Sequence, residues 1–279
     1  MFFGTPYCKY SKKYILGEDF HDASAKIVTE CMCGEKGPSI ESPDRKHNED
    51  AWNRIIGGNA TAEDEFPWQV EITVSGQFYG GGTLITPSHV LTANHVVRKQ
   101  KARDVRARLG SNDATKNKAF RVKEIFNHPD YTNTPHTAFD FAILQLEIPV
   151  PFGNSMKPAC LPGPSIPDLA ERGVIVTGWG TTTSDPSKRK YQKFLVKTPF
   201  PDPNDLEIIS NIECQKVFRK KGSVLRVEDN MLCTAPNNVV DSCTGDSGGP
   251  MVVFDIDHNR WTLVSEPYYF GACWPNCPP

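Results

Sequence analysis

The segment Asp241-Ser242-Cys243-Thr244-Gly245-Asp246-Ser247-Gly248-Gly249-Pro250 is the most informative stretch of this 279-residue chain. A serine flanked by glycines can expose its hydroxyl on a sharp turn, because glycine adopts backbone conformations that other residues avoid. Backbone N–H groups that no side chain shields can then converge on an oxyanion. Serine alone is a poor nucleophile near neutral pH and needs an oriented general base. The segment therefore predicts a nucleophile, Ser247, whose partners lie elsewhere in the chain.

Two upstream segments can supply these partners. The first, Leu91-Thr92-Ala93-Asn94-His95-Val96, places His95 where an apolar β-run turns into a short helix. The second, Asp140-Phe141-Ala142-Ile143-Leu144, places a carboxylate at the mouth of an apolar strand. An acid that heads a buried strand loses hydration and needs a donor, for which an imidazole N–H is suitable. Taken singly, a histidine at a strand end and an aspartate before an apolar run are usually structural.

The composition limits the classes of protein to which this chain can belong. Its 31 Lys and Arg residues against 33 Asp and Glu residues give a net charge of −2, which argues against a nucleic acid as the main partner. No apolar run approaches the ~18 residues of a membrane span. With 38% hydrophobic residues the chain can bury a core, and its 21 glycines and 23 prolines favour short strands and turns. A fibre, a membrane protein and a helical bundle are excluded.

Short β-rich runs separated by turn residues dominate the chain from Phe66 onward, which is typical of an antiparallel sandwich or barrel. These runs are residues 68–74, 83–85, 105–109, 141–146, 174–179, 251–254 and 261–264. One helix signal is good: Ser210-Asn211-Ile212-Glu213 fits a capping box and predicts a short helix through about Phe218. Residues 35–53 are polar and lack any period, so residues 1–54 are expected to form an extended, flexible pro-segment.

The segments around His95, Asp140 and Ser247, in that chain order, resemble the trypsin-like serine proteases of the chymotrypsin fold. The resemblance covers about residues 54–278 and extends to five further motifs. They are Arg54-Ile55-Ile56-Gly57-Gly58, Phe66-Pro67-Trp68-Gln69-Val70, Gly81-Gly82-Thr83-Leu84-Ile85, Val176-Thr177-Gly178-Trp179-Gly180 and Asp229-Asn230-Met231-Leu232-Cys233. It implies an all-β fold of two six-stranded-type antiparallel β-barrels with the site between them. Residues 1–54 would be a pro-segment or light chain, and residues 55–279 the protease domain.

The resemblance also implies a role for each site residue. Ser247 would attack the scissile carbonyl, with His95 as general base and then general acid, while Asp140 would orient the imidazole. The N–H groups of Gly245 and Ser247 would form the oxyanion hole. No metal and no organic cofactor is implied. The implied partners are a protein or peptide substrate, an activating trypsin-like protease and a protein protease inhibitor, but no nucleic acid and no membrane.

Specificity is implied by Asp241, which lies six positions before Ser247, where the family places the base of its primary pocket. A carboxylate there costs desolvation unless the substrate brings a cation, so cleavage after Arg or Lys is expected. The entrance wall departs from the family pattern. The register Tyr269-Phe270-Gly271 lets the substrate backbone approach the glycine, whereas the alternative register would put Phe270 across the pocket mouth.

Arg54-Ile55 resembles the activation bond of a zymogen. Cleavage there would free an α-amine at Ile55 able to pair with the carboxylate of Asp246, and such a buried pair would order the loop that shapes the oxyanion hole. A zymogen of a secreted, extracellular enzyme is therefore expected, although no signal peptide is visible at the start of this sequence.

Nine cysteines suit disulfides in an oxidising compartment. The resemblance implies the pairs Cys33–Cys160, Cys214–Cys233 and Cys243–Cys273, and it leaves Cys8, Cys31 and Cys277 unassigned. An odd remainder indicates a free thiol, an intermolecular bridge or an imperfect sequence. Two disulfides common in the family have both partners replaced, one by Gly80 and Val96 and the other by Val174 and Val253.

The C-terminal region is the other departure. Family members continue with a strand behind the specificity pocket and a closing helix, whereas this sequence stops at Pro279, so the second barrel is expected to be truncated. The alternative to an active protease is then a catalytically impaired homologue that acts as a binding or regulatory protein. A third alternative is an incomplete chain.

Overall fold

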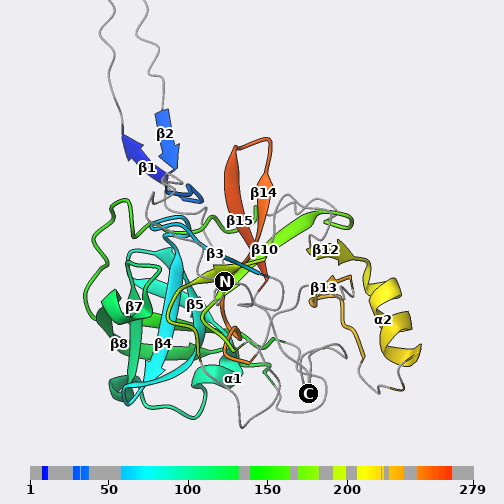
Figure 1. Ribbon diagram of the computed structural model, residues 1–279, viewed down its shortest axis with the longest axis horizontal. Coiled ribbons are helices and arrows are strands. Elements are labelled where there is room, and N and C mark those ends of the chain that lie inside the picture. Colours follow the sequence, from blue (N-terminus) through cyan, green and yellow to red (C-terminus); the bar gives the residue numbers. More distant parts are fainter. Residues whose placement is uncertain are drawn as a thin grey trace, which may run out of the picture.

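A computed structural model gives the architecture of most of the chain. It describes residues 33–37, 58–131, 139–163, 169–181, 191–198, 206–220, 222, 226–235 and 244–265, together with the backbone of residues 8–11 and 28–31. The described residues are mostly strands, with few and short helices (Figure 1). None of the helices in these ranges is long and apolar enough to cross a membrane.

The first half of the fold is a closed antiparallel barrel of six strands. Its order is β4-β5-β6-β9-β8-β7. The strands are β4 (Gln69–Val74), β5 (Gln77–Thr86), β6 (His89–Thr92), β7 (Val105–Leu109), β8 (Lys118–Asn127) and β9 (Ala142–Leu146). Its interior is filled by side chains such as Val70, Ile72, Leu84 and Leu144, all fully buried. The short helix α1 (Asn94–Val97) and the 3-10 helices η2 (Ala102–Asp104) and η3 (Ala114–Lys116) connect its strands.

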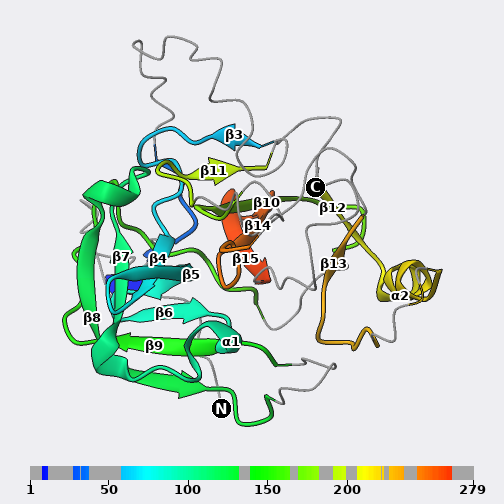
Figure 2. The same cartoon turned by 60° about the horizontal axis from the view of Figure 1, so that its bottom comes forward.

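The second half is a sheet that does not close within the described residues. Its path is β13-β12-β10-β11-β3, and the hairpin β14-β15 joins it through β10. The strands are β3 (Asn59–Ala60), β10 (Gly173–Gly178), β11 (Val196–Lys197), β12 (Leu206–Ile209), β13 (Cys233–Thr234), β14 (Met251–Asp255) and β15 (Arg260–Ser265). One closed barrel beside a second, open sheet confirms the all-β, chymotrypsin-like fold predicted from the sequence (Figure 2).

The helix signal is confirmed, and its cap is formed as expected. Helix α2 (Asn211–Lys220) follows Ser210, whose Oγ accepts a hydrogen bond from the N–H of Glu213 at 3.3 Å. The helix runs two residues beyond the predicted end at Phe218. The disulfide Cys214–Cys233 ties it to β13.

Some strands form where the sequence predicted none. Strand β8 was not predicted, because only Val122 is buried among its ten residues and the alternating pattern is therefore absent. This segment forms a strand because its backbone pairs with β7 on one side and β9 on the other. In the N-terminal region, β1 (Cys8–Ser11) and β2 (Val28–Cys31) form an antiparallel pair in which Cys8 and Cys31 are register partners.

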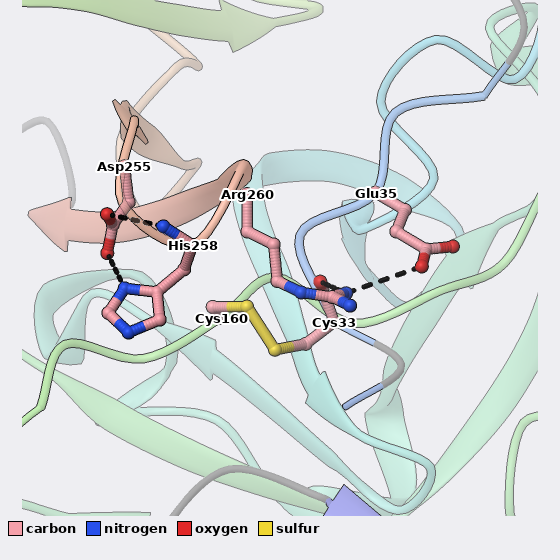
Figure 3. Close-up of a disulfide and its surroundings, with 6 residues drawn as sticks. All are labelled: Cys33, Glu35, Cys160, Asp255, His258 and Arg260. Carbon is pink, nitrogen blue, oxygen red and sulfur yellow. Dashed lines mark hydrogen bonds and ion pairs between the residues drawn. A yellow bond between two sulfur atoms is a disulfide. The ribbon is translucent and has the colours of Figure 1, made fainter. Parts of the chain in front are cut away.

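Residues 33–37 form a tether that fastens the N-terminal region to the rest of the chain. The disulfide Cys33–Cys160 is its covalent part. Gly34 donates its N–H to the carbonyl of Pro158 at 2.8 Å and accepts from the N–H of Trp261 at 2.9 Å. Figure 3 shows Arg260 beside the disulfide, where its Nη1 donates to the carbonyl of Cys33 at 2.7 Å and lies 3.3 Å from Glu35 Oε1. The tether is therefore held by backbone and side-chain contacts as well as by the disulfide.

The amine of Lys36 belongs to the same tether and lies between two aromatic rings. It is 4.5 Å from the ring centroid of Phe66 and 4.4 Å from that of Trp261. Glu65 Oε1 lies 3.5 Å away, and Lys197 contacts the same carboxylate. Burial lowers the pKa of Lys36 to about 8, an effect that Lys197 reinforces and Glu65 only partly offsets. Burial alone would raise the pKa of Glu65, but hydrogen bonds from Lys197 and from the Ala62 N–H hold it below its ordinary value.

The stability of the tether should consequently depend on pH through Lys36. Its pKa is about 8 in the folded chain against 10.5 as the reference value, so the unfolded state binds more protons between these values. Stability must then rise with pH. Relative to Lys36→Met, the free energy of unfolding of the wild type should increase by about 2 kcal/mol between pH 7 and pH 9.5 in urea titrations with intact disulfides. The control Lys118→Met, which removes an exposed lysine, should retain the wild-type pH dependence. A wild-type curve parallel to that of Lys36→Met would contradict the prediction.

Candidate active site

His95 and Asp140 meet because of the way in which two barrel strands pair. Strands β6 and β9 are antiparallel, and Thr92 at the end of β6 is the register partner of Ala142 at the start of β9. His95 comes three residues after Thr92, in α1, and Asp140 comes two residues before Ala142. The end of one strand and the beginning of the other therefore place both side chains at the same edge of the barrel.

The Asp140 carboxylate holds His95 by two hydrogen bonds. Oδ2 lies 2.7 Å from the ring Nδ1 of His95, and Oδ1 accepts the backbone N–H of His95 at 2.8 Å. The side chain of Asp140 is only 7% exposed, whereas that of His95 is 30% exposed. In the neutral imidazole this carboxylate favours the proton on Nδ1, so that Nε2 is the nitrogen that carries the basic lone pair. The pair thus has the geometry of an oriented general base.

A tight turn presents the carboxylate to the histidine. The N–H of Phe141 donates to the carbonyl of Phe139 at 2.8 Å, so a three-residue turn is centred on Asp140. Phe139 has a φ of 61°, a left-handed conformation that is costly for a bulky residue. Its ring stacks on His128 with centroids 4.6 Å apart, a contact that holds this conformation in place.

The Ser247 loop is fastened to the same edge of the barrel. Gly81 of β5 donates its N–H to the carbonyl of Ser247 at 2.9 Å. The next residue, Gly248, has a φ of 79° and packs so closely that a Cβ there would lie 2.4 Å from Thr92 Oγ1 and 2.8 Å from the nitrogen of Ala93. Ala93 is two residues before His95. The structure therefore brings the Ser247 loop against the strand end that carries His95.

Asp246 points away from the solvent into the second sheet. The residue is 1% exposed, and its Oδ1 accepts the N–H of Gly180 at 2.9 Å. A Cβ at Gly180 would lie 2.5 Å from that oxygen, so only glycine allows this approach. The carboxylate next to the expected nucleophile is thus held by the backbone that follows β10.

Two aromatic rings that no sequence motif predicted cover Gly245. The rings of Phe78 and Tyr191 have centroids 4.5 Å apart, and a Cβ on Gly245 would lie 2.9 Å from each. Gly245 itself has a φ of 101°. Both aromatic residues come from outside the motif, so no local pattern in the sequence marks them as neighbours of this glycine.

The pair that replaces the expected disulfide near His95 is also in contact. A Cβ at Gly80 would lie 3.2 Å from Val96 Cγ2, so the valine methyl groups occupy the space beside the glycine. Val174 and Val253, the second replaced pair, are both buried in the apolar cluster of the second sheet.

The remaining predicted site residues lie outside the described residues. They are Arg54, Ile55, Asp241, Cys243, Phe270, Gly271 and Cys273, and the unassigned Cys277 lies outside as well. Within the part of the chain that the structure describes, no group of three or more His, Cys, Asp or Glu side chains could hold a metal ion.

A family model described as Trypsin matches residues 55–256. Transmembrane protease serine 9 of Rattus norvegicus is 32% identical over 211 residues, which cover 72% of this chain and 19% of that protein. Vitamin K-dependent protein C of Mus musculus is 31% identical over 283 aligned positions, which cover 95% of this chain and 58% of that protein. The chain thus spans less than two thirds of the length of either relative.

The close contact at Gly248 can be tested against a glycine of similar conformation. Gly76 has a φ of 82°, but a Cβ there would meet nothing within 4 Å. Gly76→Ala should therefore cost only the backbone strain, about 1–2 kcal/mol. Gly248→Ala should cost at least about 1 kcal/mol more in urea unfolding, because the new methyl group must displace Thr92 or the Ser247 loop. Equal losses for the two variants would show that the loop does not press against β6.

Proposed function

Because the chain belongs to the trypsin family of serine proteases, we propose that it is a serine endopeptidase that cleaves peptide bonds after Arg or Lys. The observation that carries the proposal is the doubly hydrogen-bonded pair of Asp140 and His95, with the Ser247 loop fastened to the same barrel edge. Serine nucleophiles need an oriented imidazole as general base, and the loop that carries the half-buried Ser247 lies against the barrel edge that carries His95.

The proposed reaction proceeds through an acyl-enzyme. Ser247 Oγ attacks the scissile carbonyl carbon while its proton passes to His95 Nε2, and Asp140 stabilises the imidazolium that forms. The C–N bond then breaks as His95 gives this proton to the leaving amine. In the second half of the cycle, water gives a proton to His95 and attacks the ester carbonyl carbon, and the bond from that carbon to Ser247 Oγ breaks as His95 returns the proton to Oγ. The N–H groups of Gly245 and Ser247 would stabilise the oxyanion, each by about 3–4 kcal/mol.

We propose that the chain is a zymogen activated by cleavage after Arg54. The new α-amine of Ile55 would pair with the carboxylate of Asp246. This residue is buried and directly precedes Ser247 in the sequence. An ion pair there would fix the loop that carries the oxyanion donors. The Cys33–Cys160 disulfide and the contacts of residues 33–37 support a light chain, residues 1–54, that stays attached to residues 55–279 after cleavage. Disulfides also support a secreted, extracellular protein.

A fluorophosphonate probe tests catalysis directly. After limited cleavage by trypsin, the chain should label at Ser247 and hydrolyse an arginine ester. Ser247→Ala should abolish both signals. Asp140→Asn should lower kcat by about 10⁴-fold, because the imidazole would hold the wrong tautomer.

Two controls make this experiment decisive. Arg54→Gln should resist activation and remain unlabelled under the same treatment, and its full labelling without a new N-terminus would contradict the zymogen proposal. A folded, cleaved wild-type chain that does not label would instead support the alternative, a catalytically impaired homologue that binds a partner without turnover.

Substrate preference depends on Asp241 in this proposal. Its carboxylate would pair with the cationic side chain of the substrate, so Asp241→Ser should abolish the preference for Arg and Lys in a peptide-library digest while leaving Ser247 able to react with a fluorophosphonate. The control Asp257→Ser removes an exposed aspartate on the β14-β15 turn and should leave the preference unchanged. An Asp241→Ser enzyme that still cleaves after Arg and Lys would rule out this role.

A further inference from the structure

Positive charge is concentrated in one part of the first barrel. Residues 98–123 contain ten Lys and Arg residues against two Asp residues, although the whole chain has a net charge of −2. Of the two acids, Asp113 is buried and pairs with Lys193, which lies outside this stretch. The fold does not require such an uneven distribution of charge. The distribution indicates a surface that binds an anionic partner.

The strand register gathers these charges on the outer face of the barrel. Burial alternates along β7, so that Val105, Ala107 and Leu109 point inward and Arg106 points outward. Arg106 is the direct register partner of Arg121 on β8. Like charges placed opposite each other destabilise a sheet, and within the described residues neither arginine has an ion pair that would offset the repulsion.

Neighbouring cations extend the pair into a larger surface. We call it the basic face and define it by Lys101, Arg103, Arg106, Arg121 and Lys123. Helix η2, which contains Arg103, contacts β8. Arg106 Nη1 donates to the carbonyl of Arg103 at 2.7 Å, which fixes the guanidinium beside η2. All members except Arg106 are exposed, and Arg106 is half-buried.

The basic face is poorly neutralised by the chain itself. Asp104 lies 3.9 Å from Arg103 Nε, which is a weak ion pair at the surface. Glu124 and Glu147 border the face, but within the described residues neither forms an ion pair with it. Lys101, Arg106, Arg121 and Lys123 have no ion pair in the same part of the chain. The face therefore keeps most of its charge available to a partner.

We propose that the basic face binds a sulfated polysaccharide. Such a polymer repeats a permanent negative charge along its length, and arginine forks bind oxyanion groups of this kind in a bidentate manner. An acidic protein segment would be expected to use an apolar anchor as well. Among the described residues, no exposed large hydrophobic side chain lies between residues 98 and 123. Bases of a single-stranded nucleic acid would need aromatic platforms, and the described residues from 98 to 123 include no exposed aromatic side chain.

Binding to immobilised heparin tests the proposal on the uncleaved chain, so the result does not depend on catalytic activity. The wild type should bind heparin at 50 mM NaCl, and its affinity should fall steeply up to 300 mM. The triple variant Arg103→Gln, Arg121→Gln and Lys123→Gln should bind at least about tenfold more weakly, since each surface cation near a dense anionic array contributes measurably. The control triple variant changes Lys216, Arg219 and Lys220 to Gln on α2, at the opposite edge of the molecule from β8 (Figures 1 and 2).

The control should stay within about twofold of the wild type. Equal weakening by both triple variants would overturn the proposal, because binding would then follow net charge rather than this surface. Absence of heparin binding at 50 mM NaCl would overturn it as well. Binding of polyglutamate or of desulfated heparin as tightly as heparin would overturn the assignment to sulfate groups and favour an acidic protein partner.

Discussion

The hydrogen bonds between Asp140 and His95 depend on a constraint that begins in the barrel wall. Because Thr92 and Ala142 are register partners, the end of β6 and the beginning of β9 share one edge, and the residues just beyond them must meet. A slip of one residue in that register would turn every side chain of a strand to the other face. The closed barrel, with its fully buried Val70, Ile72 and Leu144, prevents such a slip. The core of the first barrel therefore determines the geometry of the candidate base.

The second half of the fold contributes the serine loop, which meets the first barrel through close backbone contacts. Gly81 binds the carbonyl of Ser247, and Gly248 approaches Thr92 more closely than any residue with a Cβ could. Gly81 on the barrel and Gly248 in the loop have no side chains, so the two backbones can approach closely. At His95 the valine methyl groups of Val96 lie against Gly80, so packing supplies part of the restraint that a disulfide would give.

Local patterns in the sequence predicted those parts of the molecule whose structure is decided locally. The alternation in Val105–Leu109 and the cap at Ser210 each have their cause within a few residues, and both elements form as predicted. Strand β8 has one buried residue, so its identity is decided by β7 and β9 and could not be predicted from its own pattern. The same holds for the rings of Phe78 and Tyr191 over Gly245, which only the three-dimensional fold brings together.

The tether connects the two halves with the N-terminal region. Gly37 donates its N–H to the carbonyl of Asp64, which precedes the first barrel, while Gly34 pairs with Trp261 of β15 in the second sheet. Lys36 lies between Phe66 and Trp261, one ring from each half. A segment held in this way resists removal even where the chain is cut further along, because its contacts do not depend on continuity with residue 55. The proposed cleavage after Arg54 would then release a new N-terminus without loosening the contacts that residues 33–37 make with both halves of the fold.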